Sequence, residues 1–162
     1  MHKVGAVFQS RCLMALVCCS LAACSSQPDS TSVDLELAKD VNSVQQKMLQ
    51  VHQQWQGTPY RLGGTNKAGV DCSAFVQYLY LDVYNKTLPR TTELQLSQGT
   101  AVPLSQVKTG DLIFFQTSYK VRHVGVVYDQ NHFLHASTSK GVIFSRIDNV
   151  YWSPKVIAIK RL

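Results

Sequence analysis

Charged residues are scarce in this chain, at 16% of its 162 residues, and Lys and Arg never form a run longer than two. The formal net charge is nevertheless +6, because Lys and Arg outnumber Asp and Glu by 16 to 10. Nucleic-acid binding normally needs basic residues clustered on one face or along one helix. The sequence therefore gives little support to a nucleic-acid partner. Its mild positive charge is compatible with attraction to an anionic polymer such as cell wall.

A long apolar stretch is also missing. The apolar run from Cys12 to Leu21 has ten residues, which is too short to span a bilayer as a helix but suits a secretory signal. Two basic residues precede it, and "LAAC" (Leu21–Cys24), which follows, resembles a bacterial lipobox. We therefore predict a lipoprotein signal peptide over residues 1–23, a lipidated Cys24 and a polar tether over residues 24–33. The alternative is an ordinary signal peptide that contains cysteines by chance.

Ser25 bears on where such an anchor would lie. A serine directly after the lipidated cysteine resembles the pattern that sends Gram-negative lipoproteins to the outer membrane. We expect an outer-membrane anchor, with the domain facing the periplasm, and more than one acyl chain makes such attachment stable.

Cysteine is rare beyond this N-terminal region. Four of the five cysteines lie within the first 24 residues, and the fifth is Cys72. A lone thiol in an oxidising compartment has no intramolecular disulfide to form. Cys72 is therefore either buried and inert or kept for its reactivity, and composition does not decide between the two.

Residues 34–162 are predicted to form one α+β domain. Apolar residues at spacings of three and four predict an amphipathic helix over residues 34–55. The tight loop "TPYRLGG" follows, then a helix from about Cys72 to Tyr84 and a short third helix closed by Gly99. Five later runs, rich in β-branched and aromatic residues, predict strands: "DLIFF", "HVGVVY", "HFLHAS", "VIFSRI" and "VIAIKRL". Helices followed by strands favour an antiparallel sheet over alternating βαβ units.

Cys72 is predicted to start the second helix. The unpaired N–H groups and the positive end of the helix dipole favour an anion there, which would lower the pKa of the thiol. The backbone N–H groups of Cys72 and Ser73 could also receive the oxyanion of a tetrahedral intermediate. A helix-start cysteine with apolar neighbours is more often a core residue, so this position needs a base before it indicates catalysis.

Two histidines in neighbouring predicted strands could supply that base. His123 and His135 are twelve residues apart, and a hairpin centred on Asp129 would place them directly opposite each other on one face. We assign His123 as the base and His135 as the group that fixes its tautomer. The competing arrangement is a zinc site made of Cys72 and both histidines, which lacks an obvious fourth ligand and any close ligand pair. We expect no metal and no cofactor.

The motifs "TPYRLGG", "GVDCSAFV", "LPRTTELQ", "TGDLIFF", "RHVGVVYDQNHFLHASTSKGV" and "DNVYW" resemble, in order, those of the NlpC family of bacterial cell-wall cysteine peptidases. The resemblance covers about residues 51–162. It implies a papain-like α+β fold, with N-terminal helices, the nucleophile at a helix N-terminus and an antiparallel sheet. It also implies a triad of Cys72, His123 and His135, with Tyr60 lining the site and helping to hold the substrate or its oxyanion.

The family substrates are peptidoglycan stem peptides. The resemblance implies an endopeptidase that cuts a stem-peptide amide, first of all the bond between the γ-carboxyl of D-glutamate and a diamino acid such as diaminopimelate. The second candidate bond is the D-alanyl–diaminopimelate cross-link. Two further functions compete with an endopeptidase: a wall-binding module with a decayed site, and an acyltransferase or amidase that uses the same thiol.

Two positions depart from the family pattern. Ala74 replaces a glycine that often follows the Asp-Cys-Ser sequence, and its methyl group could crowd a substrate on the first helical turn. Leu62 stands where family members often have an aromatic residue. Arg90 and Arg122 could contact substrate carboxylates, but a structural or solvated charge is the favoured interpretation of each.

Overall fold

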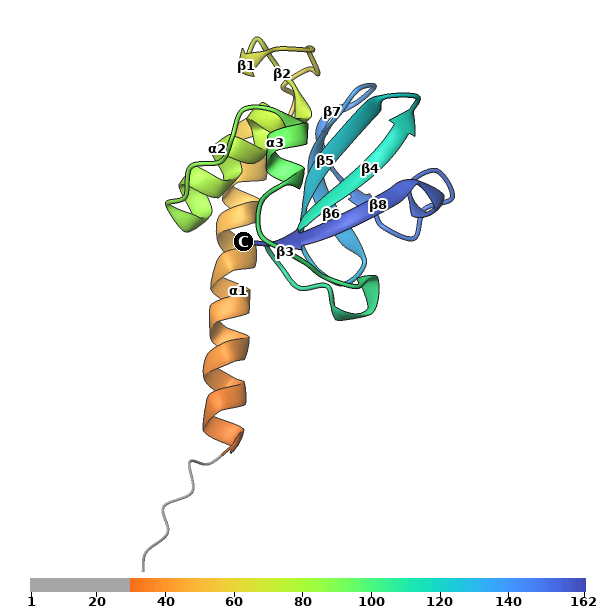
Figure 1. Ribbon diagram of the computed structural model, residues 1–162. Helices are drawn as coiled ribbons and strands as arrows, with labels where there is room; N and C mark the ends of the chain where they lie inside the picture. The colour runs from red at the N-terminus through yellow and green to blue at the C-terminus, as the bar shows by residue number, and fades with distance from the viewer. Residues whose placement is uncertain (1–29) are drawn as a thin grey trace, which may run out of the picture.

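The computed structural model describes residues 30–162 (Figure 1). The predicted signal peptide, Cys24 and residues 24–29 of the predicted tether lie outside the described residues. The first helix, α1 (Ser30–Trp55), begins four residues before the predicted start at residue 34, so the end of the predicted tether is helical. Within the described part of the chain, no helix combines the length and apolar character needed to cross a membrane.

Helix α1 packs through an apolar stripe near its C-terminal end. Met48, Val51 and Trp55 recur at spacings of three and four and are buried, as the sequence pattern predicts. Gly57 ends the helical region with a φ of 82°, a left-handed conformation that glycine adopts without strain.

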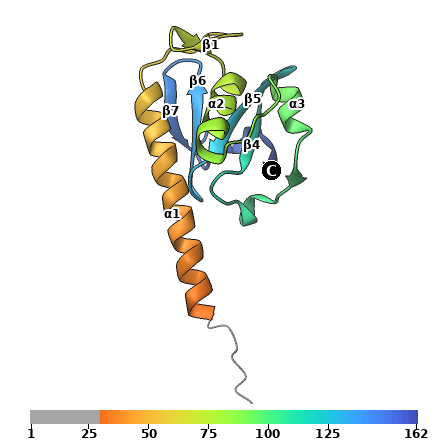
Figure 2. The same cartoon turned by 90° about the vertical axis from the view of Figure 1, so that its left-hand side faces the viewer.

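Helix α2 (Cys72–Tyr84) is largely apolar because it is covered on both sides. It contacts α1 on one side and strands β5 (Val121–Val127) and β6 (His132–Ser137) on the other (Figure 2). The Asp71 side chain caps its first turn by accepting a hydrogen bond of 2.8 Å from the Ala74 N–H. Asn85 closes the helix with a φ of 50°.

The main sheet has six antiparallel strands in the order β3-β8-β4-β5-β6-β7. The last strand, β8, therefore pairs with β4, the first of the predicted strands, and not with β7, which precedes it in the sequence. A two-stranded hairpin, β1 with β2, precedes α2. The remaining elements are β1 (Thr65–Asn66), β2 (Gly69–Val70), α3 (Thr92–Leu96), β3 (Thr100–Ala101), η1 (Leu104–Gln106), β4 (Leu112–Ser118), β5 (Val121–Val127), β6 (His132–Ser137), β7 (Gly141–Arg146), η2 (Ser153–Lys155) and β8 (Val156–Arg161).

The two faces of this sheet differ in what covers them. One face packs against α1 and α2 through an apolar cluster that includes Phe114, Val124 and Leu134. The other face carries a second cluster that includes Phe115 and Phe133, with Trp152 packed against it. The helices precede an antiparallel sheet in the chain, and the helix that starts at Cys72 packs on that sheet. This arrangement confirms the predicted papain-like α+β class.

Candidate active site

Cys72 lies at the N-terminus of α2, as predicted, but it is only 5% exposed. The backbone N–H groups of Val124 and Ser73 act to lower the pKa of this thiol. Val124 directly follows His123 along β5, so the thiol lies beside the strand that carries the predicted base. The sulfur also lies 3.7 Å from Oγ1 of Thr92, which comes from α3.

Tyr60 is held close to Cys72 by backbone pairing. Tyr60 forms a bridge with Val70, and the neighbouring bonds are Arg61 N–H to the Val70 carbonyl (3.1 Å) and Val70 N–H to the Pro59 carbonyl (3.0 Å). The "TPYRLGG" loop is thereby attached to the residues just before α2. Burial raises the Tyr60 pKa to about 12, helped by the negative charges that Cys72 and Asp71 can carry. Tyr60 therefore keeps its hydroxyl proton at neutral pH and can donate it in a hydrogen bond.

His123 and His135 meet on one face of the sheet. His123 Nε2 lies 2.8 Å from His135 Nδ1, and the two rings are nearly perpendicular, at 88°. The shared face is confirmed, but the predicted direct opposition is wrong. The observed pairs Val126↔Leu134 and Val127↔Phe133 centre the hairpin one residue later than predicted, so the two histidines lie diagonally across the strands.

Gly125 makes the diagonal contact possible. A Cβ atom at this position would lie 2.6 Å from Cδ2 of Phe133 and 3.2 Å from Cβ of His135. Any larger residue would push β6 away from β5 at the level of the two imidazoles.

Two residues that the sequence did not indicate as functional complete this arrangement. Ser145 Oγ, on β7, lies 2.9 Å from His135 Nε2, so both ring nitrogens of the fully buried His135 have partners. Trp152 stacks on His123 with a centroid separation of 5.2 Å and meets His135 edge-on. Its place before the final strand predicts core packing, although "DNVYW" is among the family motifs. We call His123, His135 and Ser145 the neutral cluster.

Burial keeps the neutral cluster and the thiol uncharged. It lowers the pKa of His123 to about 4. Burial, and then the charge that His123 can carry, also hold the pKa of His135 well below its ordinary value. Burial raises the pKa of Cys72 and outweighs the hydrogen bonds that its thiolate would accept. The lowered thiol pKa expected at a helix start is therefore wrong for the free protein, because desolvation exceeds the helix effect.

A second set of polar groups, Asp71, Ser73 and Arg90, surrounds the same helix start, and we call it the charged cluster. Arg90 donates two hydrogen bonds to Asp71, at 2.9 and 2.6 Å, and one of 3.0 Å to Ser73 Oγ. Burial opposes the charge of Asp71, but the bonds from Arg90 and Ala74 prevail and lower its pKa. The structural interpretation of Arg90 is thus confirmed. The Ser73 side chain belongs to this network, because its hydroxyl donates to Asp71 Oδ1 at 3.1 Å.

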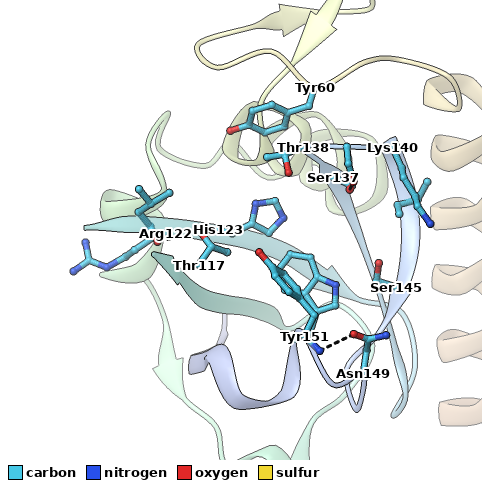
Figure 3. A pocket seen from close by; sticks show the side chains of 14 residues that line it. Tyr60, Thr117, Arg122, His123, Ser137, Thr138, Lys140, Ser145, Asn149 and Tyr151 are labelled. Carbon is cyan, nitrogen blue, oxygen red and sulfur yellow. Dashed lines mark hydrogen bonds between the residues drawn. The ribbon is translucent and has the colours of Figure 1, made fainter. Parts of the chain in front are cut away.

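An open cleft of about 590 Å³ gives access to His123. Tyr60 lies over His123 on one side and Tyr151 faces it from the other (Figure 3). The guanidinium of Arg122 points away from the cleft and pairs with Glu93 of α3. Among the described residues that line the cleft there are many hydroxyl groups and no carboxylate: Tyr60, Thr117, Val121, Arg122, His123, Ser137, Thr138, Ser139, Lys140, Ile143, Ser145, Asn149, Tyr151 and Trp152.

The two departures from the family pattern are not among these lining residues. Ala74 is 1% exposed and packs in the cluster beneath the helices, so its methyl group does not crowd the cleft. Leu62 is 84% exposed on the loop that carries Tyr60.

The zinc alternative finds no support in the geometry. His135 uses one ring nitrogen for His123 and the other for Ser145. Across residues 30–162, no group of three or more His, Cys, Asp or Glu residues is arranged to hold a metal ion.

Comparisons with known proteins agree with these features. The NlpC/P60 family profile matches residues 57–161. A probable endopeptidase of Haemophilus influenzae is 39% identical over 155 residues, 93% of this chain and 96% of that protein. The murein DD-endopeptidase MepS/murein LD-carboxypeptidase of Escherichia coli is 40% identical over 119 residues, 74% of this chain and 63% of that protein. In the solved structures, the NlpC/p60 domain of the peptidoglycan hydrolase SagA is similar with a TM-score of 0.60 at 28% identity, covering 73% of this chain and 98% of that one.

Proposed function

Because this chain belongs to the NlpC/P60 family of cell-wall cysteine peptidases, we propose that it hydrolyses an amide bond in peptidoglycan stem peptides. Cys72 is the nucleophile, His123 is the base and His135 orients His123. The observation that carries this assignment is the 2.8 Å contact between the imidazoles of His123 and His135. His123 directly precedes Val124 on β5, and the Val124 backbone influences the pKa of Cys72.

The hydrogen bonds of the two rings support one route for each proton. His123 Nε2 is engaged with His135 Nδ1, so Nδ1 of His123 is the nitrogen that takes the proton from Cys72. Once His123 is protonated, its Nε2–H donates to His135 Nδ1. His135 then carries its own proton on Nε2 and donates it to Ser145 Oγ.

The sulfur attacks the amide carbonyl, and the resulting oxyanion is stabilised by N–H groups at the start of α2 and by the hydroxyl of Tyr60. His123 next gives its proton to the leaving amine, which produces an acyl-enzyme. Water, activated by the same imidazole, releases the acyl group. The protonated Tyr60 suits this role because a phenolate could not donate a hydrogen bond.

The cleft chemistry supports a stem peptide as the substrate. Stem peptides carry several carboxylates, and the described lining residues offer hydroxyl groups and Lys140 without a competing carboxylate. Aromatic side chains at Tyr151 and Trp152 add apolar surface beside His123.

Two bonds are candidates for cleavage. The motif resemblance favours the D-γ-glutamyl–diaminopimelate bond. The 40% identity to a murein DD-endopeptidase favours the D-alanyl–diaminopimelate cross-link instead. Digestion of purified monomeric and cross-linked muropeptides, with the product masses determined, separates the two, because only cross-link cleavage converts dimers into intact monomers.

The nucleophile is tested by Cys72→Ser. This variant should remain folded and lose muropeptide cleavage, and undiminished activity would refute the assignment. If the chain is instead a wall-binding module, the wild-type protein and Cys72→Ser should both be retained on sacculi, and neither should release peptide. An acyltransferase or amidase would yield products of different mass from the same muropeptides.

We also propose that the chain is anchored to the outer membrane through lipid on Cys24 and faces the periplasm. The proposal is supported by the order of basic residues, short apolar run and "LAAC" in the sequence. Cys24→Ala should move the protein from the membrane fraction to the soluble fraction. An unchanged membrane fraction would contradict it.

A further inference from the structure

The hydroxyl of Thr92 lies 3.7 Å from the sulfur of Cys72, and the proposed triad gives it no role. Thr92 is the first residue of α3, and its neighbours fix this short helix against the start of α2. Two residues earlier, Arg90 binds Asp71, and three residues later Gln95 donates to the carbonyls of Ser73 (3.0 Å) and Pro89 (2.9 Å). The position of Thr92 is therefore built into the fold.

The surroundings of Cys72 create a need for such a hydroxyl. Burial raises the thiol pKa, and the nearby charge of Asp71 raises it further. Burial also lowers the pKa of His123 to about 4, so the resting pair is a neutral thiol and a neutral imidazole. A thiolate formed here gains little from solvent, and short-range hydrogen-bond donors must stabilise it.

Three groups able to donate to the sulfur act to lower the Cys72 pKa: the hydroxyl of Thr92, at 3.7 Å, and the backbone N–H groups of Val124 and Ser73. The two backbone groups are present whatever residue occupies those positions. Thr92 is therefore the donor that depends on a side chain.

We propose that Thr92 is a catalytic residue that donates a hydrogen bond to the Cys72 sulfur as its proton leaves. This inference rests on the proposed peptidase function. In this step the S–H bond breaks, the proton moves to Nδ1 of His123 and the electron pair stays on sulfur. The Thr92 O–H bond remains intact. When that electron pair forms the bond to the carbonyl carbon, the sulfur loses its charge and the hydrogen bond weakens. Thr92 therefore stabilises the thiolate more than the acyl-enzyme.

The test compares Thr92→Val, which keeps the shape and removes the hydroxyl, with Thr92→Ser, which keeps the hydroxyl. The rate of Cys72 alkylation by iodoacetamide is measured against pH in the folded, full-length protein. Mass spectrometry of the peptide that contains Cys72 separates it from the other cysteines. Thr92→Val should move the profile up by about one pH unit, and Thr92→Ser should leave it in place.

Muropeptide cleavage supplies the second readout. At neutral pH, kcat of Thr92→Val should fall by up to about tenfold, with KM unchanged and activity recovering at alkaline pH. The loss is limited because a thiolate of higher pKa is more nucleophilic. Thr91→Val is the matched control, since the Thr91 side chain caps α3 by accepting a hydrogen bond from the Leu94 N–H. It should lower the melting temperature without moving the alkylation profile.

An unmoved profile in folded Thr92→Val, or an equal shift in Thr91→Val, would overturn the proposal. Alkylation needs no substrate, so this failure is distinct from a failure of the proposed function. If the wild-type protein cleaved no muropeptide but Thr92→Val still shifted the profile, the contact with the thiol would stand and the peptidase assignment would fall.

Discussion

The charged cluster lies at the start of α2 and the neutral cluster lies on β5, β6 and β7, and the two differ in how they treat charge. In the charged cluster, Arg90 is 38% exposed and holds Asp71 ionised, which fixes the first turn of α2. In the neutral cluster, His123 and His135 are buried and uncharged at neutral pH. An ion pair suits a group that must keep one position. A neutral imidazole suits a group that must accept a proton and release it again.

The neutral cluster should carry the largest effect on activity. His135→Ala removes the acceptor for the Nε2–H of protonated His123, so kcat should fall by about a hundredfold to a thousandfold. His132→Ala is the matched control, because His132 begins the same strand and pairs with Asp129 at the surface, at 3.0 Å. Steady-state kinetics with a muropeptide substrate measure both variants. Equal losses in the two would show that the strand matters and the imidazole contact does not.

Acid should destabilise the two clusters in different pH ranges. The pKa of His123 is about 4 in the folded protein and close to 6.5 in an unfolded chain. Between these values the unfolded chain binds more protons, so stability is present above pH 6.5 and falls as the pH falls toward 4. The loss from His123 is about 3 kcal/mol, and His135 adds to it with the same sign.

The charged cluster should stay intact over that range. Although burial opposes the charge of Asp71, its bonds to Arg90 and Ala74 place its folded pKa below the ordinary value. Its contribution is therefore present above about pH 4 and is lost only at lower pH. Urea unfolding followed against pH measures both ranges. His123→Gln should flatten the curve between pH 4 and 6.5, and an unchanged slope would contradict the assignment of that range to the imidazole.

Disrupting the charged cluster should lower the stability of the protein more than its activity. Arg90→Leu leaves the Asp71 carboxylate, whose side chain is 7% exposed, without its main partner. The expected loss is about 2 kcal/mol, less than for a fully buried pair because Arg90 reaches solvent. The unbalanced negative charge should also raise the thiol pKa. Chemical denaturation and Cys72 alkylation measure the two effects.

Arg122→Gln serves as the comparison, because Arg122 pairs with Glu93 at the surface. Its effect should stay below about 1 kcal/mol. If Arg122→Gln lowers the free energy of unfolding as much as Arg90→Leu does, then burial of the carboxylate partner does not determine how much stability is lost.

The sequence predicted what local patterns control. Helix spacing, the helix start at Cys72 and the alternation that puts both histidines on one face were all confirmed. The register between β5 and β6 was predicted wrongly. A shift of one residue in the centre of the hairpin keeps His123 and His135 on one face, and it changes only which residue lies directly opposite each of them. The pairing of β8 with β4 brings together residues 41 to 48 positions apart, such as Phe115 with Val156 and Leu112 with Lys160, and no local signal specifies it. Ser145 and Thr92 were not predicted for the same reason. Their contacts, with His135 and Cys72, join elements that are distant in the sequence.

Ala74 offers the smallest and most selective test, on the same first turn that Asp71 caps. Ala74→Gly restores the glycine that family members often carry and should lower stability by about 1 kcal/mol, because glycine loses more backbone freedom in a helix than alanine. The Ala74 methyl group is buried beneath the helices, whereas the cleft is lined by His123. The ratio of cleavage rates for cross-linked and monomeric muropeptides should therefore stay constant. A changed ratio would show that this turn contacts substrate, and the sulfur would then have to be approached across α2.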